Sequence, residues 1–140
     1  MADLNSFYAS WTPRLLSVLR IVSAFLLIAH GAQKLFGFLA PPGAPRPPLM
    51  SQIGIGGALE FFGGLLLLLG LFTRPVAFIL SGMMAVAYFQ MHALTGGGIF
   101  SLPLQNKGEL AALYCFVFLF LAVAGGGEWS LDRLLRRDRS

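Results

Sequence analysis

Four apolar stretches, each about as long as a bilayer-crossing helix, constrain the fold more than any other feature of the sequence. A helix rises about 1.5 Å per residue, so about 20 apolar residues cross the hydrocarbon core. The stretches cover residues 13–38, 52–72, 75–94 and 108–126. Only 11% of the residues are charged, against roughly 25% in soluble domains, which is too few to cover a water-facing surface. The sequence therefore predicts an all-α integral membrane protein, a four-helix bundle in a bacterial inner (plasma) membrane.

The links between these stretches predict an antiparallel, up-and-down bundle. The turn Thr73-Arg74-Pro75 is so short that the helices on either side must be antiparallel neighbours, and proline suits a first helical position. The proline-rich link around residues 39–51 cannot be a regular helix. Residues 1–12 are expected to form an N-terminal cytoplasmic segment, and residues 127–140 a cytoplasmic tail. That tail is either a short amphipathic helix begun by Ser130 and Asp132 and lying on anionic lipid, or a frayed end.

The distribution of Lys and Arg predicts which way the bundle faces. With four spans, both termini and the turn at residues 73–75 share one side. That side holds Arg14, Arg74, Arg133, Arg136, Arg137 and Arg139, and the other holds Lys34, Arg46 and Lys107. The positive-inside rule then places both termini in the cytoplasm. The net charge of +4 forms no basic face for nucleic acid, so we expect no such partner.

Glu60 is the most informative polar residue, because lipid cannot hydrate an ionised carboxylate. Its helical neighbours at three and four residues' distance are all glycine: Gly56, Gly57, Gly63 and Gly64. Small residues let another helix approach closely, so Glu60 is expected to face a helix contact. Two interpretations stay open: a structural ion pair, or a carboxylate that handles a proton or binds a ligand.

Further polar residues are predicted to gather around Glu60 in the outer half of the bundle. His30 and Lys34 lie on one face of the first stretch at a similar depth, which predicts a Glu60–His30–Lys34 cluster. The mouth of this cluster is expected to be lined by His92, Asn106 and Glu109.

Arg20 lies about 15 Å further inward than His30, too far to join that cluster. A buried guanidinium needs a partner. The candidates near the cytoplasmic end are Asp132 and Glu128, so Arg20 and Asp132 are expected to be structural charges.

The residue types argue against most resident cofactors. His30 and His92 are the only histidines and lie at different depths, which argues against a haem, and the set is too small for a metal site. Cys115 is the single cysteine, so CxxC redox chemistry and an intrachain disulfide are excluded. No independent catalytic motif is recognisable, and whether the chain is an enzyme by itself stays open.

Three stretches resemble the DoxX family of small four-helix membrane proteins. The first is LRIVSAFLLIAHGAQKLFGF, the second GGALEFFGGLLLLLGLFTRPVA, and the third QNKGELAALYCFVFLFLAVAGGGEWSLD. The residues that carry the resemblance are Arg20, Gly31, Lys34, Glu60, Gly63, Gly64, Gly70, Leu71, Thr73, Arg74, Asn106, Gly108, Glu109, Gly125, Gly127, Ser130 and Asp132. Gly126 stands where the family usually has proline.

The resemblance implies a membrane subunit or anchor that supports quinone- or thiol-linked redox chemistry, with a quinone or a redox partner protein held at the outer polar cluster. Glu60 would accept or relay a proton, and electrons would come through the partner or a bound quinone. The alternative is a non-catalytic scaffold, or a protein that handles small solutes or lipids, whose buried charges only fix the helix register. The bilayer is the expected surrounding, and a homo-oligomer stays open.

Overall fold

The computed structural model describes residues 2–98 and 100–137, and within them the chain is all helical, with no strand. The elements are α1 (Ala2–Phe36), α2 (Gln52–Ala58), the π-helical η1 (Leu59–Gly63), α3 (Gly64–Leu69), α4 (Thr73–Ala87), the π-helical η2 (Tyr88–Ala93), α5 (Pro103–Asn106), α6 (Glu109–Ala124) and α7 (Leu131–Arg137).

Three helical stretches of the described chain are long and apolar enough to cross a bilayer: Asp3–Phe36, Gln52–Leu69 and Thr73–Ala93. The fourth apolar helix, α6, has 16 residues and is about 24 Å long. It falls short of the roughly 30 Å of a hydrocarbon core.

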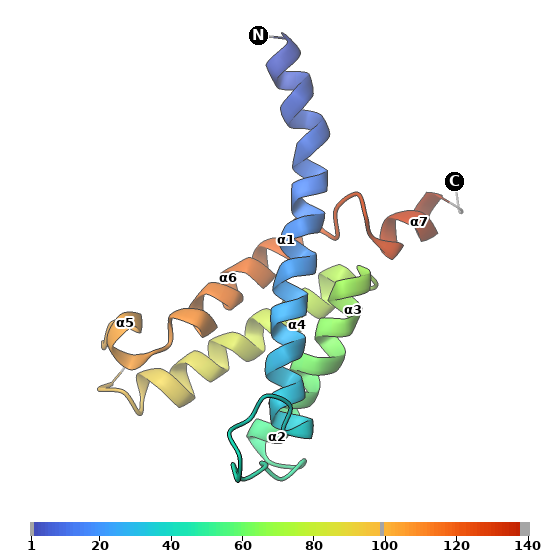
Figure 1. Ribbon diagram of the computed structural model, residues 1–140. Coiled ribbons are helices and arrows are strands. Elements are labelled where there is room, and N and C mark those ends of the chain that lie inside the picture. The colour runs from blue at the N-terminus through green and yellow to red at the C-terminus, as the bar shows by residue number, and fades with distance from the viewer. Residues whose placement is uncertain (1, 99, 138–140) are drawn as a thin grey trace.

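The helices form two hairpins that cross at an angle (Figure 1). In one hairpin α1 packs along α2, η1 and α3, and in the other α4 packs along α6. The hairpins meet around the turn from α3 to α4. We call this the arginine end, because Arg14, Arg74, Arg133 and Arg136 lie there. The opposite end, with the loops around residues 37–51 and 94–108, is the loop end.

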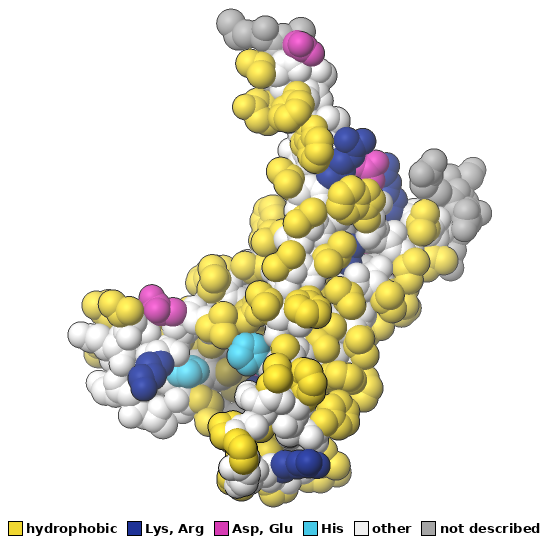
Figure 2. All heavy atoms as spheres, viewed as in Figure 1, with side chains coloured by type: hydrophobic (Ala, Val, Ile, Leu, Met, Phe, Trp, Pro, Cys, Tyr) yellow, Lys and Arg dark blue, Asp and Glu magenta, His cyan; other side chains and the backbone are white. Residues whose placement is uncertain are grey.

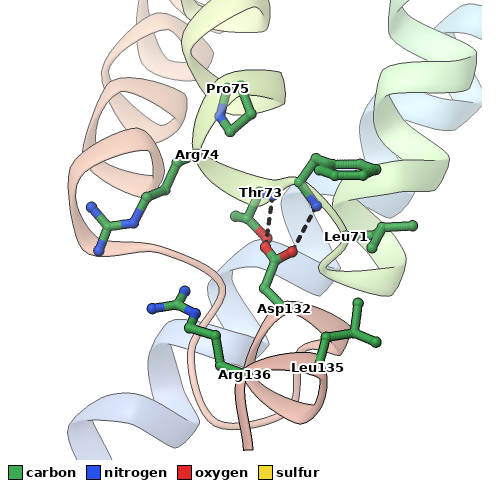
Figure 3. A pocket seen from close by; sticks show the side chains of 8 residues that line it. Leu71, Thr73, Arg74, Pro75, Asp132, Leu135 and Arg136 are labelled. Atoms are coloured by element: carbon green, nitrogen blue, oxygen red, sulfur yellow. Dashed lines mark hydrogen bonds between the residues drawn. The ribbon is translucent and has the colours of Figure 1, made fainter. Parts of the chain in front are cut away.

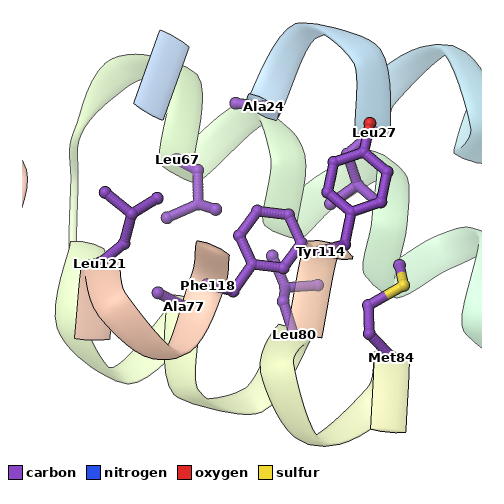
Figure 4. Close-up of a cluster of buried hydrophobic side chains, with 9 residues drawn as sticks. All are labelled: Ala24, Leu27, Leu67, Ala77, Leu80, Met84, Tyr114, Phe118 and Leu121. Atoms are coloured by element: carbon purple, nitrogen blue, oxygen red, sulfur yellow. The ribbon is translucent and has the colours of Figure 1, made fainter. Parts of the chain in front are cut away.

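A small apolar core joins the two hairpins (Figure 4). It contains Leu27 of α1, Leu67 of α3, Leu80 of α4 and Phe118 of α6, each at most 1% exposed. The outward-facing side chains are also largely apolar (Figure 2). That pattern suits a surface solvated by lipid, because a water-facing surface would carry more charge.

Glycines set the close approach of α1 to the neighbouring helix. A Cβ placed on Gly31 would lie 2.5 Å from the backbone nitrogen of Phe61, and one on Gly57 would lie 2.8 Å from Cβ of Lys34. Gly64 packs against Ile28, and Gly63 against Leu80 of α4.

Gly56 corrects the expectation that all four glycines around Glu60 pack against a helix. A Cβ on Gly56 would meet no atom within 4 Å. The expectation assumed an α-helical repeat through residues 56–64, but η1 has the wider π-helical turn. The extra residue in that turn rotates the preceding residues about the helix axis.

The helix boundaries also differ from the sequence pattern. α1 continues back to Ala2, with Pro13 inside it instead of at its start. The missing N–H of Pro13 deprives only one carbonyl, that of Ala9, of its helical donor. α4 begins at Thr73 rather than Pro75, and the tail forms the helix α7 after Ser130, whose hydroxyl accepts a hydrogen bond from the Arg133 N–H at 3.3 Å.

Candidate functional site

The centre of the candidate site is an ion pair between the two helices of the first hairpin. Nζ of Lys34, near the end of α1, donates to Oε1 of Glu60 in η1 at 2.6 Å. The Glu60 side chain is 8% exposed and that of Lys34 is 33% exposed. The carboxylate therefore lies inside the hairpin, and the lysine reaches it from the rim, as its long apolar stem allows.

The second carboxylate oxygen of Glu60 is the unusual atom of this pair. Oε2 is buried and has no hydrogen-bond partner among the described residues. A buried carboxylate normally uses both oxygens, because an unsatisfied polar atom costs about 1–3 kcal/mol. Oε2 is therefore available to a proton, a water molecule or a polar group of a ligand.

Two local features bring Lys34 and Glu60 together. Gly57 leaves room for the lysine stem, and Gly31 lets the two backbones touch. Glu60 lies within the π-helical turn of η1. Such turns are rare, and they occur frequently at functional sites because they redirect side chains.

His30 corrects the expected three-residue cluster. It is exposed, and no hydrogen bond or ion pair within the described chain joins it to Lys34 or Glu60. The buried face of α1 includes Arg20, Leu27 and Gly31, and His30 is one residue from Gly31, about 100° around the helix. His30 therefore lies at the edge of the face that meets η1, outside the buried ion pair.

The remaining expected residues form a separate group at the tip of the second hairpin. The Asn106 side chain, on a residue that is 6% exposed, donates to Ser101 Oγ at 3.1 Å and to the Tyr88 hydroxyl at 3.4 Å, and it accepts from the Gly108 N–H at 2.8 Å. Nδ1 of His92 lies 3.2 Å from the Asn106 carbonyl oxygen. Asn106 thus closes the loop before α6.

The single outer cluster expected from the sequence is therefore two groups, and no ion pair or hydrogen bond within the described chain joins one to the other. Glu109 is exposed beside the second group. The physical reason is the crossing of the hairpins, which separates their tips (Figure 1). A hydrogen bond between Gln52 of α2 and Gln90 of η2 connects the hairpins near the loop end.

Arg20 is fully buried at the arginine end, and its partners correct the expected pairing with Asp132 or Glu128. The guanidinium donates to four backbone carbonyls: Leu68 at 2.7 Å, Gly126 at 2.8 Å, Trp129 at 2.5 Å, and Leu67. The last carbonyls of a helix lack intrahelical donors. Arg20 donates to carbonyls in the last turn of α3, which ends at Leu69. The sequence signal for this helix end, and so for carbonyls that could accept from Arg20, was Gly70.

The two acidic candidates have other partners. Asp132 accepts hydrogen bonds from the backbone N–H groups of Phe72 and Thr73, both at 2.8 Å, and so caps the start of α4 (Figure 3). Glu128 pairs with Arg14 at 3.2 Å and with Arg133 at 3.5 Å. Asp132 is thus a structural charge, though not one paired with Arg20.

The described part of the chain brings together no group of three or more His, Cys, Asp or Glu side chains that could hold a metal ion. The Lys34–Glu60 site itself offers one carboxylate with a spare oxygen and one ammonium group.

Comparison with known proteins identifies bacterial relatives, two of which are named as inner membrane proteins. An uncharacterized protein of Haemophilus influenzae is 42% identical over 126 residues, which cover 87% of this chain and 91% of that protein. Two Escherichia coli proteins follow: inner membrane protein YqjF, 32% identical over 86% of this chain and 91% of its own length, and inner membrane protein YphA, 31% identical over 86% and 90%. No solved structure matches the chain significantly.

The family match covers the first hairpin and α4. The DoxX family model matches residues 15–93, more than half of the chain. That region includes Arg20, Lys34 and Glu60. Together with the relatives, the match establishes an inner-membrane protein with several membrane-spanning helices, and the chain belongs to the DoxX family.

Proposed function

We propose that the protein is an inner-membrane subunit or anchor that supports quinone- or thiol-linked redox chemistry, with the Lys34–Glu60 pair as its functional centre. In this proposal Oε2 of Glu60 takes up or passes on a proton, or receives a hydrogen bond from a bound quinone. Lys34 holds the carboxylate in place. Cys115 is the single cysteine of the chain, so the electrons would come from a redox partner protein or from the quinone itself.

The observation that carries the proposal is the unpartnered Oε2. A purely structural ion pair would be expected to satisfy both oxygens, since removing a carboxylate from water is expensive unless its hydrogen bonds are replaced. Here the lysine satisfies only one. The π-helical turn that carries Glu60 supports the same conclusion.

An apolar cavity beside η1 also supports a hydrophobic ligand. It has a volume of about 500 Å³ and lies between the α2–η1–α3 helix and α4. Its walls include Leu59, Phe62, Gly63, Ile79 and Leu80. Ligand sites are mostly apolar with a few polar groups that fix orientation, and a wall of this kind suits the prenyl tail of a quinone.

We also propose that all four apolar stretches cross the membrane as an antiparallel bundle with both termini in the cytoplasm. The arginine distribution supports this orientation under the positive-inside rule. The short α6 needs some thinning of the bilayer or the adjoining residues to complete its span.

A quinone titration of the purified protein in lipid nanodiscs tests the proposed site. Short-chain ubiquinone and menaquinone are the probes, and bound quinone is counted after rapid filtration. We expect saturable binding by the wild-type protein and loss of roughly tenfold in affinity for Glu60→Gln, the size of one charge-assisted hydrogen bond.

Glu109→Gln is the matched control, because it makes the same chemical change at an exposed carboxylate of the loop end. It should bind as the wild type does. If the wild-type protein binds no quinone, or if both variants bind equally well, Glu60 is not a quinone ligand.

The rival function is a non-catalytic scaffold, and one observation favours it. Arg20, Asn106 and Asp132 all form hydrogen bonds with backbone groups inside the protein, which is a structural role. A scaffold predicts a folded Glu60→Gln protein that still co-purifies with the wild-type partners from native membranes. The redox proposal predicts that the co-purified partner carries a redox cofactor, and that Glu60→Gln lowers its turnover without releasing it.

A further inference from the structure

Two adjoining cavities at the arginine end share the same basic walls. The smaller, of about 300 Å³, is lined by Thr73, Arg74, Asp132 and Arg136, and the larger, of about 500 Å³, by Arg74, Arg133, Arg136 and the turn at residues 125–127. We call the two together the arginine cleft. None of it belongs to the Lys34–Glu60 site, which lies at the loop end.

The arginines of the cleft outnumber the carboxylates that could neutralise them. Glu128 is engaged by Arg14 and Arg133, and both oxygens of Asp132 are used by backbone N–H groups. Within the described residues no carboxylate lies within ion-pair distance of Arg74 or Arg136. The side chains of these two extend toward one another across the cleft from α4 and α7 (Figure 3).

Two facing guanidinium groups repel each other unless an anion lies between them. Their planar forks suit the oxygens of a phosphate group. Gly125 lines the cleft without a side chain, and a Cβ placed on it would lie 3.6 Å from Nε of Arg74. Thr73, which is fully buried, has a hydroxyl with no partner in the part of the chain that the structure describes.

The surroundings of the cleft match the headgroup level of a membrane. Trp11 and Trp129 lie at the same end, with Trp11 5.5 Å from the Arg14 guanidinium carbon and Trp129 half exposed. Tryptophan gathers at membrane–water interfaces. Leu134 and Leu135 of α7 are half exposed next to Arg136, which suits a helix lying on lipid.

We propose that the arginine cleft binds a phosphate group, held between Arg74 and Arg136, and that this phosphate belongs to the headgroup of an anionic phospholipid. Basic pockets at the ends of membrane helices bind such headgroups. A free phosphate offers the same oxygens to the arginines, and the difference between the two sources lies in the acyl chains, which would run along the apolar surface outside the cleft.

Lipid binding by the full chain in a neutral detergent tests the proposal, with bound molecules counted by native mass spectrometry. The probes are phosphatidylglycerol, phosphatidylcholine and inorganic phosphate. The wild-type protein should retain phosphatidylglycerol in preference to phosphatidylcholine, and high salt should weaken the retention. Arg74→Gln with Arg136→Gln should weaken it at least about tenfold.

The matched control is Arg46→Gln with Lys107→Gln, which removes the same two charges from exposed loops at the loop end. It should retain phosphatidylglycerol like the wild type. Retention of inorganic phosphate that is lost only in the Arg74/Arg136 variant supports the phosphate site and assigns it to a free phosphate. The proposal is overturned if both double variants retain phosphatidylglycerol equally well. It is also overturned if lipid binding shows neither salt dependence nor headgroup preference, a result that the wild-type protein alone can give.

Discussion

Arg20 and Glu60 are both buried charged side chains, but they differ in how many of their polar atoms have hydrogen-bond partners. Each of the three guanidinium nitrogens of Arg20 donates to at least one of four carbonyl oxygens. Glu60 has one ammonium partner and one idle oxygen. A fully satisfied group fastens a structure, whereas an unsatisfied one is open to further chemistry. This difference is why we place function at Glu60 and stability at Arg20.

Arg20→Lys should destabilise the protein although the charge is kept. A lysine ammonium is a point charge and cannot reach carbonyls of α3 and of the turn after α6 together. The buried carbonyls left without donors should cost about 2–4 kcal/mol in the free energy of unfolding. Reversible unfolding by sodium dodecyl sulfate measures the loss.

Arg14→Lys is the control for this substitution. The Arg14 side chain is 40% exposed and pairs with Glu128, so the loss should stay below about 1 kcal/mol. An equal loss of unfolding free energy in the two variants would contradict a special role for the backbone carbonyls that accept from Arg20.

Lys34→Met should destabilise more than the double substitution of Lys34→Met with Glu60→Gln. The single change leaves a buried carboxylate without its cation, at a cost of about 2–3 kcal/mol, below the range for fully buried pairs because Lys34 is one-third exposed. The double change removes both charges, and much of the loss should return. Additive losses in the same unfolding assay would mean that the two side chains are not coupled.

At the scale of the elements, the contact between α1 and η1 depends on backbone meeting backbone. A Cβ on Gly31 would lie 2.5 Å from the Phe61 nitrogen and 2.8 Å from the Gly57 carbonyl oxygen. Neither atom belongs to a flexible side chain. The two helices must therefore separate if any larger residue occupies position 31.

Gly31→Ala should lower the free energy of unfolding by about 2–3 kcal/mol through this clash. It should also weaken the Lys34–Glu60 pair, because Lys34 follows Gly31 by one turn of α1. Gly56→Ala is the control: its Cβ meets nothing within 4 Å, and loss of glycine's flexibility should stabilise by up to about 1 kcal/mol. If Gly31→Ala left the free energy of unfolding unchanged, the two helices would not be in contact at that position.

The regular parts of these elements could be predicted, and the irregular parts could not. Apolar length alone predicted the helices, and burial of a charge predicted that Lys34 would meet Glu60. The π-helical turns η1 and η2 follow from the fit between helices, which a one-dimensional repeat does not contain. A helical wheel drawn across η1 therefore misplaced Gly56. His30 lies in the regular helix α1, where it was assigned to the buried face but is exposed beside the buried Gly31.

The pairing of Arg20 was missed for a related reason. Sequence reasoning looks for opposite charges, whereas the guanidinium donates to the carbonyls of Leu67 and Leu68 at the end of α3, of which Leu67 also accepts from the Gly70 N–H. Asp132 similarly served a helix start instead of a cation. Backbone partners depend on where helices end in space, which only the fold reveals.

At the scale of the whole molecule, two hairpins joined mainly at one end leave their tips apart (Figure 1). The arginine end contains most of the long-range hydrogen bonds and ion pairs of the described chain. They include the bonds from Arg20 to four backbone carbonyls, the Asp132 cap and the contacts of Glu128. The loop end contains the Lys34–Glu60 pair and the Asn106 group on separate hairpins. Such an arrangement ties the arginine end together by many contacts, while the Lys34–Glu60 pair lies at the more open loop end.

The number of membrane crossings decides whether this picture holds, since α6 is shorter than the other apolar stretches. Single cysteines in a Cys115→Ala background report the side of each position: Ser10→Cys before the first span, Thr95→Cys at the loop end, and Leu134→Cys in α7. With four crossings and cytoplasmic termini, a membrane-impermeant maleimide should label only Thr95→Cys in cells whose inner membrane is intact.

Disrupting the inner membrane should then expose Ser10→Cys and Leu134→Cys together, because an even number of crossings returns the chain to its starting side. Three crossings would instead place these two positions on opposite sides, and one of them would label in intact cells. That result would move the arginine cleft and α7 away from the side of the N-terminus. It would contradict the contacts of Arg14 with Glu128 and of Pro13 with the Glu128 backbone N–H, which tie the two sides of the chain together at 3.2 Å and 3.0 Å.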